Sequence, residues 1–355
     1  MLLSVQRVKK GRGHFRPFQA LGYVGVFVWG LLGVSGEGSA KTSKTSEKAF
    51  IKKIHAHIEE GLHALFPQGH ETLAIKGDLK GFSPDGKRKQ VIKDAEGKQH
   101  HLFIKIFYEH ATPAHRKRVV EVTRRLAEVW GYPLILWHDP QYHVMITEFL
   151  EHPHVKPQDF QQEGFLEAFV HRLKASHALL KTMESLEKDP LVERTKRRFK
   201  ELMAVEPLLE GRLQKAKDFL EKFESSTQDA VHGDIQKANI LKHEHPLLID
   251  WSDVRWGDVF EDLGSLAEEM EFNPAQEEKL LKQYFGTVSK EILEKLHNYR
   301  TLHRLHFGLY FTREGFKELK LKREKAQGKA FAYHPSSLQK GIKLLREFLD
   351  KRKES

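Results

Sequence analysis

One segment, residues 231–251, interrupts a C-terminal half whose pattern is otherwise helical. Its sequence, VHGDIQKANILKHEHPLLIDW, places Asp234, Asn239 and Asp250 among short apolar runs. The runs NIL and LLID predict two short strands joined by a turn at HEHP. A hairpin of this kind holds its two loop ends side by side, so we expect the three polar side chains to converge at one end. The segment predicts a polar site built around a small hairpin within a helical region.

The chain before this segment predicts a small sheet with one helix. Three short strand patterns (ETLAIKG, KQVIKDAEGK and HHLFIKIF) precede a helical pattern that ends before Pro133, and two more strand patterns follow. From Pro157 onward long stretches have helical spacing. The prediction is an α+β fold. We expect a linker and short helix at 41–60, a sheet-containing lobe at 61–150 and a mostly helical lobe at 151–355.

The three polar residues carry the functional groups that phosphoryl transfer requires. The carboxylate of Asp234 can accept a proton from a substrate hydroxyl. The amide oxygen of Asn239 and the carboxylate of Asp250 can ligate Mg²⁺, a hard cation that prefers oxygen ligands. A lysine on a strand, which pairs with phosphate groups, completes the set. Each residue alone would be read as a turn or cap residue, but their combined spacing favours this site.

The motifs HGDIQKANIL, LLIDW and GDVFEDLGSL together resemble the aminoglycoside phosphotransferase and choline kinase superfamily. These enzymes are relatives of protein kinases, with which they share the Asp-to-Asn spacing of HGDxxxxN. The resemblance covers roughly residues 60–320. It implies a two-lobed protein-kinase-like fold and an ATP- and Mg²⁺-dependent transfer of the γ-phosphate to a small-molecule hydroxyl.

The resemblance also assigns roles to individual residues. It implies that Asp234 is the catalytic residue that orients the acceptor hydroxyl, and that Asn239 and Asp250 are the Mg²⁺ ligands. Lys105, in the third strand pattern, takes the place of the lysine that pairs with the nucleotide phosphates. Glu121, in the following helix, is the candidate ion-pair partner of that lysine.

Two further segments are expected to bind the nucleotide. The sequence TEFL occupies the linker between the lobes, where backbone groups of Glu148, Phe149 and Leu150 would bind the adenine. Backbone N–H groups of Phe82 and Ser83, in KGFSPDGKRKQV, would bind the phosphates.

That phosphate loop departs from the family pattern because it is not rich in glycine. It carries the basic run Lys87, Arg88 and Lys89, which either adds positive field to the site or is an ordinary charged hairpin tip.

Two residues near the motif are predicted to have supporting roles. His232 is expected to bond the backbone of the catalytic loop. Asp262, in FEDLG, is expected to hold that loop by hydrogen bonds and to begin a helix as its N-cap. The histidine pairs 100/101, 243/245 and 303/306 lack a third ligand at a convincing spacing, so we interpret them as surface or core residues.

The acceptor is expected to bind against the helical lobe. The acidic residues Glu268 and Glu269 could attract an amine or quaternary ammonium group, and aromatic faces of Trp251 and Tyr310 could add cation–π contacts. The alternative is that the acids lie on a solvated helix face and the aromatics in the core. The resemblance leaves choline-, thiamine- or amino-alcohol-like and aminoglycoside-like acceptors open.

Composition excludes several other classes. The 355-residue chain has a formal charge of +10 but no Lys/Arg tract with interleaved aromatic residues, so nucleic acid is not an expected partner. It contains no cysteine, which excludes disulfides, thiolate metal sites and cysteine nucleophiles.

The first 40 residues form a separate pattern. A basic stretch precedes the uncharged residues 17–36, and small residues at Gly38 and Ala40 follow. This pattern predicts a signal peptide or a membrane anchor, hence export or membrane association through residues 17–36, unless translation begins later and the protein is cytoplasmic. An exported, catalytically silent kinase-fold binding protein is therefore the alternative function, although the complete catalytic set argues against it.

Overall fold

The structure, a computed structural model, describes residues 44–76, 85–107, 111–325 and 335–351. The fold and site discussed below lie within residues 53–355, which form one compact unit. Within the described ranges no helix combines the length and apolarity needed to cross a membrane. The predicted signal peptide or anchor, residues 1–40, lies outside these ranges, and export stays a prediction.

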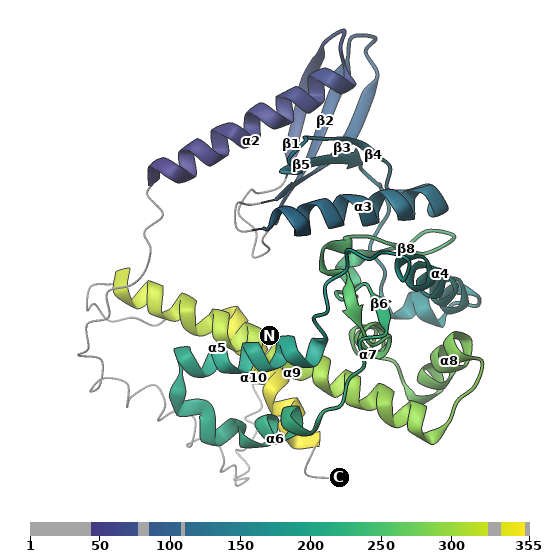
Figure 1. Cartoon of the computed structure of the whole chain (residues 1–355), viewed down its shortest axis with the longest axis vertical. Coiled ribbons are helices and arrows are strands. Elements are labelled where there is room, and N and C mark those ends of the chain that lie inside the picture. The colour runs from purple at the N-terminus through teal and green to yellow at the C-terminus, as the bar shows by residue number, and fades with distance from the viewer. Residues whose placement is uncertain (1–43, 77–84, 108–110, 326–334, 352–355) are drawn as a thin grey trace, which may run out of the picture. The chain divides into compact units, whose positions relative to one another are not determined.

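Five antiparallel strands form the main sheet in the order β1-β2-β3-β5-β4 (Figure 1). The bounds are β1 His70–Lys76, β2 Asp85–Asp94, β3 Gln99–Phe107, β4 Ile135–His138 and β5 Val144–Glu148. The register places Lys87 of β2 opposite Lys105 of β3, and Lys105 opposite Met145 of β5. Since residues opposite one another in an antiparallel pair share a face of the sheet, these three side chains lie on one face.

Each face of the sheet is covered by a helix. Alternation along β3 turns Leu102, Ile104 and Ile106 to one face, and all three are buried. The helix α2 spans Lys44–Leu65, and its part from Lys53 onward packs near that face, where Gly61 closely approaches Ile146 of β5.

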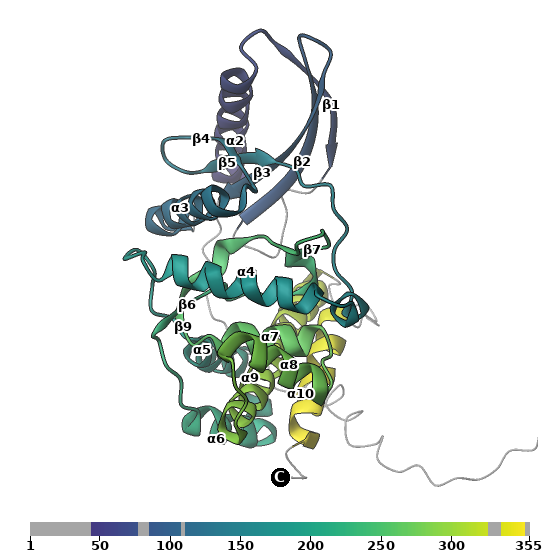
Figure 2. The same ribbon diagram turned by 90° about the vertical axis from the view of Figure 1, so that its right-hand side faces the viewer.

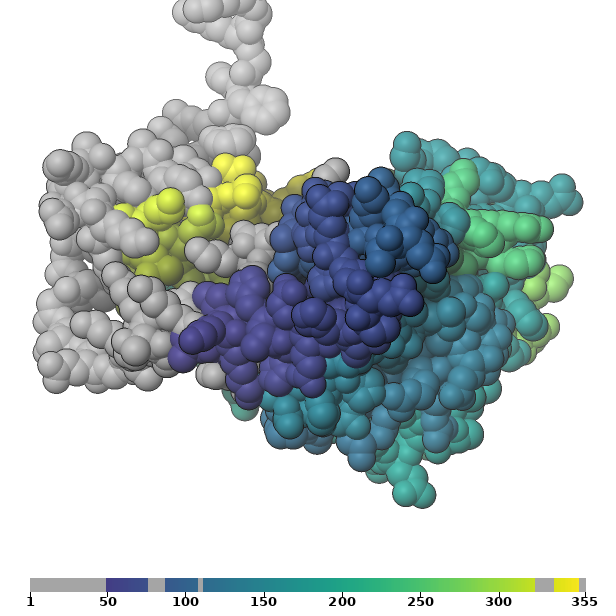
Figure 3. All heavy atoms as spheres, turned by 90° about the horizontal axis from the view of Figure 1, so that it is seen from above, coloured from purple at the N-terminus to yellow at the C-terminus, as the bar shows by residue number. Residues whose placement is uncertain are grey.

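The opposite face, which carries Lys105 and Phe107, is covered by α3 (Pro113–Trp130). The side chain of Thr112 caps α3 by accepting the N–H of His115 at 3.1 Å, and Gly131 ends the helix in the left-handed conformation. In two perpendicular views α3 lies between the sheet and the helical region (Figure 1, Figure 2). In the space-filling view from above, the blue surface of the sheet region continues into that of the helical region, in teal and green (Figure 3).

The helical region is built around one large apolar core. Its longest helix, α9, packs against α5, α7 and α10. The helices are α4 Phe165–Leu180, α5 Leu191–Val205, α6 Gln214–Lys222, α7 Phe260–Glu269, α8 Pro274–Phe285, α9 Lys290–Lys325 and α10 Ser336–Lys351, with short 3-10 turns η3 Pro157–Gln161, η4 Pro207–Leu213, η5 Lys237–Asn239 and η6 Trp251–Asp253. A small antiparallel sheet beside a larger helical region confirms the predicted α+β class.

Two short strand pairs interrupt the helices. The predicted hairpin is present as β7 (Ile240–Leu241) and β8 (Leu247–Leu248), joined by the HEHP turn. A second pair, β6 (Asp229–Val231) with β9 (Arg255–Gly257), encloses the hairpin. Because β6 enters the HGD motif and β9 follows Asp253, this second pair brings the two ends of the motif region together.

Candidate active site

The backbone of the HGD motif is held by the carboxylate of Asp262. This carboxylate accepts the N–H of His232 at 2.7 Å and the N–H of Gly233 at 2.9 Å, and it also contacts Nε2 of His177 at 2.9 Å. Burial would raise the pKa of Asp262, but the hydrogen bond with His177 holds the pKa below its ordinary value. The buried loop is thereby anchored to the first turn of α7 through a charged acceptor.

Asp262 does not itself cap α7. The helix begins at Phe260, with Val259 at the N-cap position, and Asp262 is its third residue. The N–H of Phe260 instead donates to the carboxylate of Asp258 at 3.1 Å. The predicted N-cap role is therefore wrong. The predicted hydrogen bonds with the loop are present, and Asp262 is their acceptor.

His232 uses both ring nitrogens on the backbone. Its Nδ1 accepts the N–H of Asp234 at 3.2 Å, so Nε2 carries the proton and donates to the carbonyl of Ile249 at 3.0 Å. The ring is fully buried and packs edge-on against Trp251. This bonding matches a structural role and leaves no ring nitrogen for proton transfer.

Gly233 occupies a position that excludes any other residue. Its φ of +82° lies in the left-handed region. A Cβ atom there would lie 1.7 Å from Nη1 of Arg255 and 2.6 Å from the carbonyl oxygen of Asp253. The close packing of this loop against the start of β9 therefore requires glycine.

Asp234 and Asn239 are joined directly. The amide nitrogen of Asn239 donates to the Asp234 carboxylate at 2.8 Å and to the Asp234 carbonyl at 2.9 Å. Gln236 donates to the same carboxylate at 2.8 Å. Because its amide nitrogen is used in this way, Asn239 is left with its amide oxygen as the group that can bind a cation.

The environment of Asp234 disfavours its charged form. Burial raises the pKa of this carboxyl, and the negative charges of Asp253 and Asp250 add to the effect. A carboxylate with a raised pKa accepts a proton more readily than an ordinary one, which suits a residue that receives the proton of a hydroxyl group.

Asp250 follows the hairpin, and its carboxylate contacts two lysines of the sheet. Nζ of Lys105 donates to its carboxylate at 2.7 Å, and Lys87 contacts the other carboxylate oxygen. Burial alone would raise the pKa of Asp250, but the two lysines outweigh it and hold the pKa well below its ordinary value. The N–H of Ile249 also donates to the carbonyl of Asn239 at 2.9 Å, which ties the two loop ends together. Asp234, Asn239, Asp250 and Lys105 therefore lie in one site.

Lys87 adds positive charge to the site, which was one of the two alternatives considered for the basic run. The run Lys87, Arg88 and Lys89 is not at a hairpin tip but within β2. Alternation then points Lys87 and Lys89 to the face that carries Lys105, while Arg88 is buried on the other face. The predicted strand begins at Lys89. A strand that begins at Asp85 would have predicted that Lys87 and Lys105 lie on the same face of the sheet.

In the linker between the two regions, two backbone N–H groups already donate to carbonyl groups of the protein. The N–H of Phe149 donates to the carbonyl of His101 at 2.9 Å, and the N–H of Glu148 donates to the carbonyl of Leu134 at 3.3 Å. Beside them, Nζ of Lys89 lies 3.8 Å from the centroid of the Phe149 ring. Of the three residues expected to bind adenine, Leu150 is the one whose N–H these contacts do not use.

Glu121, the predicted ion-pair partner of Lys105, forms a different pair. Across the part of the chain that the structure describes, the ion-pair partner of Glu121 is Lys117, four residues earlier in α3, at 3.7 Å. Phe82 and Ser83 lie outside the described residues.

The acidic residues considered for acceptor binding have internal partners or are partly buried. Glu268 forms a close ion pair with Arg304 at 2.6 Å and a second with Arg300. Glu269 is half-buried, and burial raises its pKa. Glu268 was expected to attract a cationic acceptor, but arginines of α9 compensate its charge.

The aromatic candidates also have internal contacts. The guanidinium of Arg198 lies 4.5 Å from the centroid of the Tyr310 ring. Burial lowers the pKa of Arg198 to about 9. Trp251 is buried and donates its indole N–H to the carbonyl of Leu248 at 3.1 Å. One cation of the protein itself therefore already occupies a face of Tyr310.

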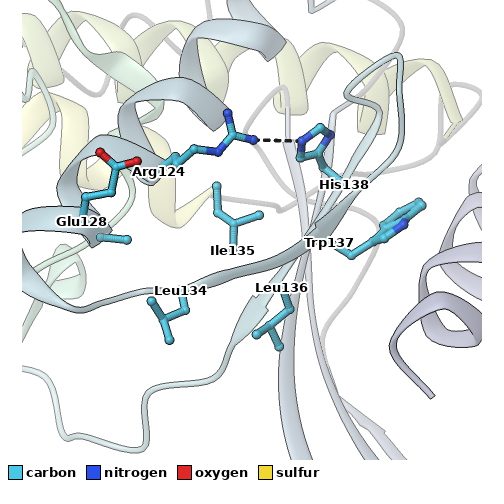
Figure 4. Close-up of a pocket in the computed structure, with 8 residues that line it drawn as sticks. Arg124, Glu128, Leu134, Ile135, Leu136, Trp137 and His138 are labelled. Atoms are coloured by element: carbon cyan, nitrogen blue, oxygen red, sulfur yellow. Dashed lines mark hydrogen bonds between the residues drawn. The ribbon is translucent and has the colours of Figure 1, made fainter. Parts of the chain in front are cut away.

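A separate groove of about 440 Å³ lies along β4 and α3 (Figure 4). Arg124 and Glu128 line it from α3, and residues 134–138 line it from the sheet edge. Arg124 bonds the ring of His138 at 3.0 Å. The groove contains none of the predicted catalytic residues.

Comparisons with known proteins agree with this geometry. A sequence model of the phosphotransferase enzyme family matches residues 78–300. Similar solved structures include choline kinase LicA from Streptococcus pneumoniae, with 19% identity, a TM-score of 0.53 and coverage of 83% of this chain and 99% of that chain. A choline kinase from Cryptosporidium parvum Iowa II has 14% identity, a TM-score of 0.56 and coverage of 79% and 89%.

A type I macrolide 2′-phosphotransferase has 18% identity, a TM-score of 0.52 and coverage of 77% and 97%. LicA is also solved in complex with AMP. A search by sequence among curated proteins finds no match. At these identities the solved structures establish the fold, and the family model spans more than half of the chain. The resemblance seen in the motifs is confirmed, and the protein belongs to the phosphotransferase enzyme family.

Proposed function

We propose that this protein is an ATP- and Mg²⁺-dependent kinase that transfers the γ-phosphate to a hydroxyl group of a small molecule. One observation carries the proposal: Asp234, Asn239, Asp250 and Lys105 meet in one site although they come from a sheet and from a helical region. The residue types and their arrangement are those that phosphoryl transfer uses.

The oxygen ligands available in the site fit Mg²⁺. The amide oxygen of Asn239 and the carboxylate of Asp250 are hard donors, and the pKa of Asp250, held low by Lys105 and Lys87, keeps it ionised at neutral pH. Bound there, Mg²⁺ would supply positive charge to the phosphate oxygens.

The sheet would supply the remaining positive charge. Lys105 and Lys87 lie opposite each other on the face toward Asp250, where phosphate oxygens can replace part of their contact with the carboxylate. The nucleotide would then extend toward the linker, where Leu150 offers backbone groups to the adenine. The AMP complex of LicA supports nucleotide binding in this fold.

The proton of the acceptor hydroxyl would pass to Asp234. In the reaction a bond forms between the acceptor oxygen and the γ-phosphorus, and the bond from that phosphorus to the β-phosphate oxygen breaks. The carboxylate of Asp234 receives the proton as the new bond forms, and its raised pKa favours this acceptance. The hydrogen bonds from Asn239 and Gln236 hold the carboxylate in one orientation.

The acceptor is proposed only as a small alcohol. Choline-, thiamine- and amino-alcohol-like compounds and aminoglycosides all remain in this class. Because Arg304 neutralises Glu268 and Arg198 covers a face of Tyr310, those two residues give a cationic acceptor no advantage over a neutral one.

The test is release of ADP from Mg·ATP by protein lacking residues 1–40, with a panel of choline, ethanolamine, thiamine, homoserine, sugars and aminoglycosides. We expect turnover with one acceptor class and a loss of about 10³-fold in Asp234→Asn, since a positioned base contributes roughly 10²–10⁴-fold. The matched control is Asp229→Asn. Asp229 lies on the neighbouring strand β6, and its carboxylate pairs with Lys181. Absence of Mg²⁺-dependent nucleotide binding would contradict the proposal and leave the catalytically silent binding protein.

A further inference from the structure

Three side chains of metal-ligand type meet in the sheet region, away from the catalytic residues. They are His57 of α2, and Asp139 and His143 of the turn between β4 and β5. Their ligand atoms all lie within 4.8 Å of one another. Two imidazoles and one carboxylate form a ligand set typical of zinc and other first-row divalent metals.

One ring nitrogen of His57 has no hydrogen-bond partner among the described residues. Its Nε2 is buried and forms no hydrogen bond with the residues that the structure describes. Its Nδ1 lies 3.4 Å from the carboxylate of Glu60, one turn further along α2. A carboxylate on the far nitrogen is the contact that orients metal-binding histidines and fixes their tautomer. A buried nitrogen without a partner is unfavourable unless a ligand satisfies it.

Asp139 is fixed in position by the turn. It is fully buried and accepts the N–H groups of Val144 at 2.6 Å and Gln141 at 3.1 Å. Nδ1 of His143 lies 3.3 Å from the same carboxylate. The rings of His57 and His143 are nearly parallel, with their centroids 5.7 Å apart. A helix and a tight turn therefore hold the three ligand groups close together.

Two cations near the cluster limit its affinity for a metal ion. Burial lowers the pKa of His143, and Arg116 and Lys53 lower it further, against the contrary effect of Asp139. The same two cations oppose a bound metal ion, while the carboxylates of Asp139 and Glu60 compensate.

Packing beside the cluster keeps α2 close to the turn. Gly61, one turn after His57, lies so near the sheet that a Cβ atom would be 2.5 Å from the ring of Trp137 and 2.8 Å from Ile146. Ile54, Ile58 and Leu62 on the same side of α2 are buried. His57 therefore cannot move far from Asp139 while this packing persists.

We propose that His57, Asp139 and His143 bind a divalent metal ion of the zinc class, which ties α2 to the β4–β5 turn, with water completing the coordination. The site differs in chemistry from the catalytic pair Asn239 and Asp250, which offers only oxygen. It stabilises the sheet region and takes no part in phosphoryl transfer.

The first test is titration of the metal-free full-length chain with Co²⁺, whose visible absorption distinguishes tetrahedral nitrogen-containing sites from six-coordinate oxygen sites. We expect one equivalent of tetrahedral Co²⁺, displaced by Zn²⁺. His57→Gln should weaken Zn²⁺ binding by at least about 100-fold, since loss of outer contacts alone costs roughly 10–100-fold. The matched control is His55→Gln, an exposed histidine two residues earlier on the same helix.

The chain has 22 histidines, which can bind Zn²⁺ unspecifically. The comparison of these two variants distinguishes such binding from binding at the proposed site. Equal Zn²⁺ affinity in His57→Gln and His55→Gln, or a wild-type chain without a tetrahedral Co²⁺ spectrum, would overturn the proposal. A second measurement is the thermal unfolding midpoint with and without Zn²⁺. We expect Zn²⁺ to raise it in the wild type and in His55→Gln but not in His57→Gln or His143→Gln.

The variant Glu60→Gln provides a finer readout. It keeps all three ligands and weakens the contact that orients His57. We expect it to reduce Zn²⁺ affinity by about 10-fold, between the control and His57→Gln. An affinity equal to that of the wild type would remove Glu60 from the proposed site.

Discussion

The helical region and the sheet contribute to the active site in different ways. In the helical region the catalytic loop is held through its backbone, because Asp262 binds the N–H groups of His232 and Gly233. The sheet instead reaches the site with the side chains of Lys105 and Lys87. One region supplies fixed backbone geometry and the other supplies positive charge. Changes in the first should reduce turnover, and changes in the second should reduce nucleotide affinity.

The largest expected effect comes from the buried ion pair behind the catalytic loop. Arg255 donates to Glu261 at 2.6 Å and to the carbonyl of Asp253 at 2.8 Å, and both charged side chains are buried. Arg255→Met leaves Glu261 without its buried counter-ion, which should cost about 3 kcal/mol in the free energy of unfolding. Urea denaturation measures this value. As a control, Lys290→Met breaks an exposed pair with Glu294 and should cost less than about 0.5 kcal/mol.

The geometry of the loop is tested by Gly233→Ala. The added Cβ would meet Arg255 and the Asp253 carbonyl, so the loop that carries Asp234 must shift. We expect turnover to fall by about 100-fold, the effect of displacing a catalytic group by about 1 Å.

Gly131→Ala is the matched control for this change. Gly131 has a similar positive φ of +76°, but apart from its chain neighbours no described residue lies within 4 Å of its Cβ position. Its backbone strain should cost about 1 kcal/mol of stability and leave turnover unchanged. If both variants lost turnover equally, backbone strain rather than the contact with Arg255 would be responsible.

The charge supplied by the sheet is tested by replacing each lysine with methionine. Lys105 is 3% exposed and Lys87 is 44% exposed, so the contribution of Lys87 is screened more strongly by water. We expect Lys105→Met to raise the KM for ATP by about 10-fold or more and Lys87→Met by about 3-fold, as for charge-assisted contacts. Lys93→Met on the exposed part of β2 should have no effect. A larger loss of turnover than of affinity would contradict the division between the two regions.

The smallest effect concerns the pH dependence of turnover. Burial and the charge of Asp253 raise the pKa of Asp234, so activity should fall on the acid side at a higher pH than for an ordinary aspartate. Asp253→Asn removes a negative neighbour, which favours the ionised form and should move this acid limb to lower pH. The profile of kcat/KM against pH measures the shift. Movement to higher pH would show that another group titrates.

Local motifs were predictable, whereas partners distant in the sequence were not. The spacing from Asp234 to Asn239 lies within one loop, and that loop folds as the hairpin pattern indicated. The sequence shows the negative charge of Glu268 but not its partner Arg304, 36 residues later on α9. The approach of His57 to His143 likewise depends on the packing of α2, which periodicity alone does not place.

The contact of Asp250 with two lysines has a consequence for how ligands assemble in the site. The lysines act as internal counter-ions, so a metal cation that binds Asp250 must compete with positive charge already present. Phosphate oxygens that draw the lysines away relieve this competition. For the proposed kinase, metal and nucleotide binding would then be thermodynamically linked, and each would raise the affinity for the other by the same factor. Under the proposed function, the site would therefore admit the metal–nucleotide complex in preference to either component alone.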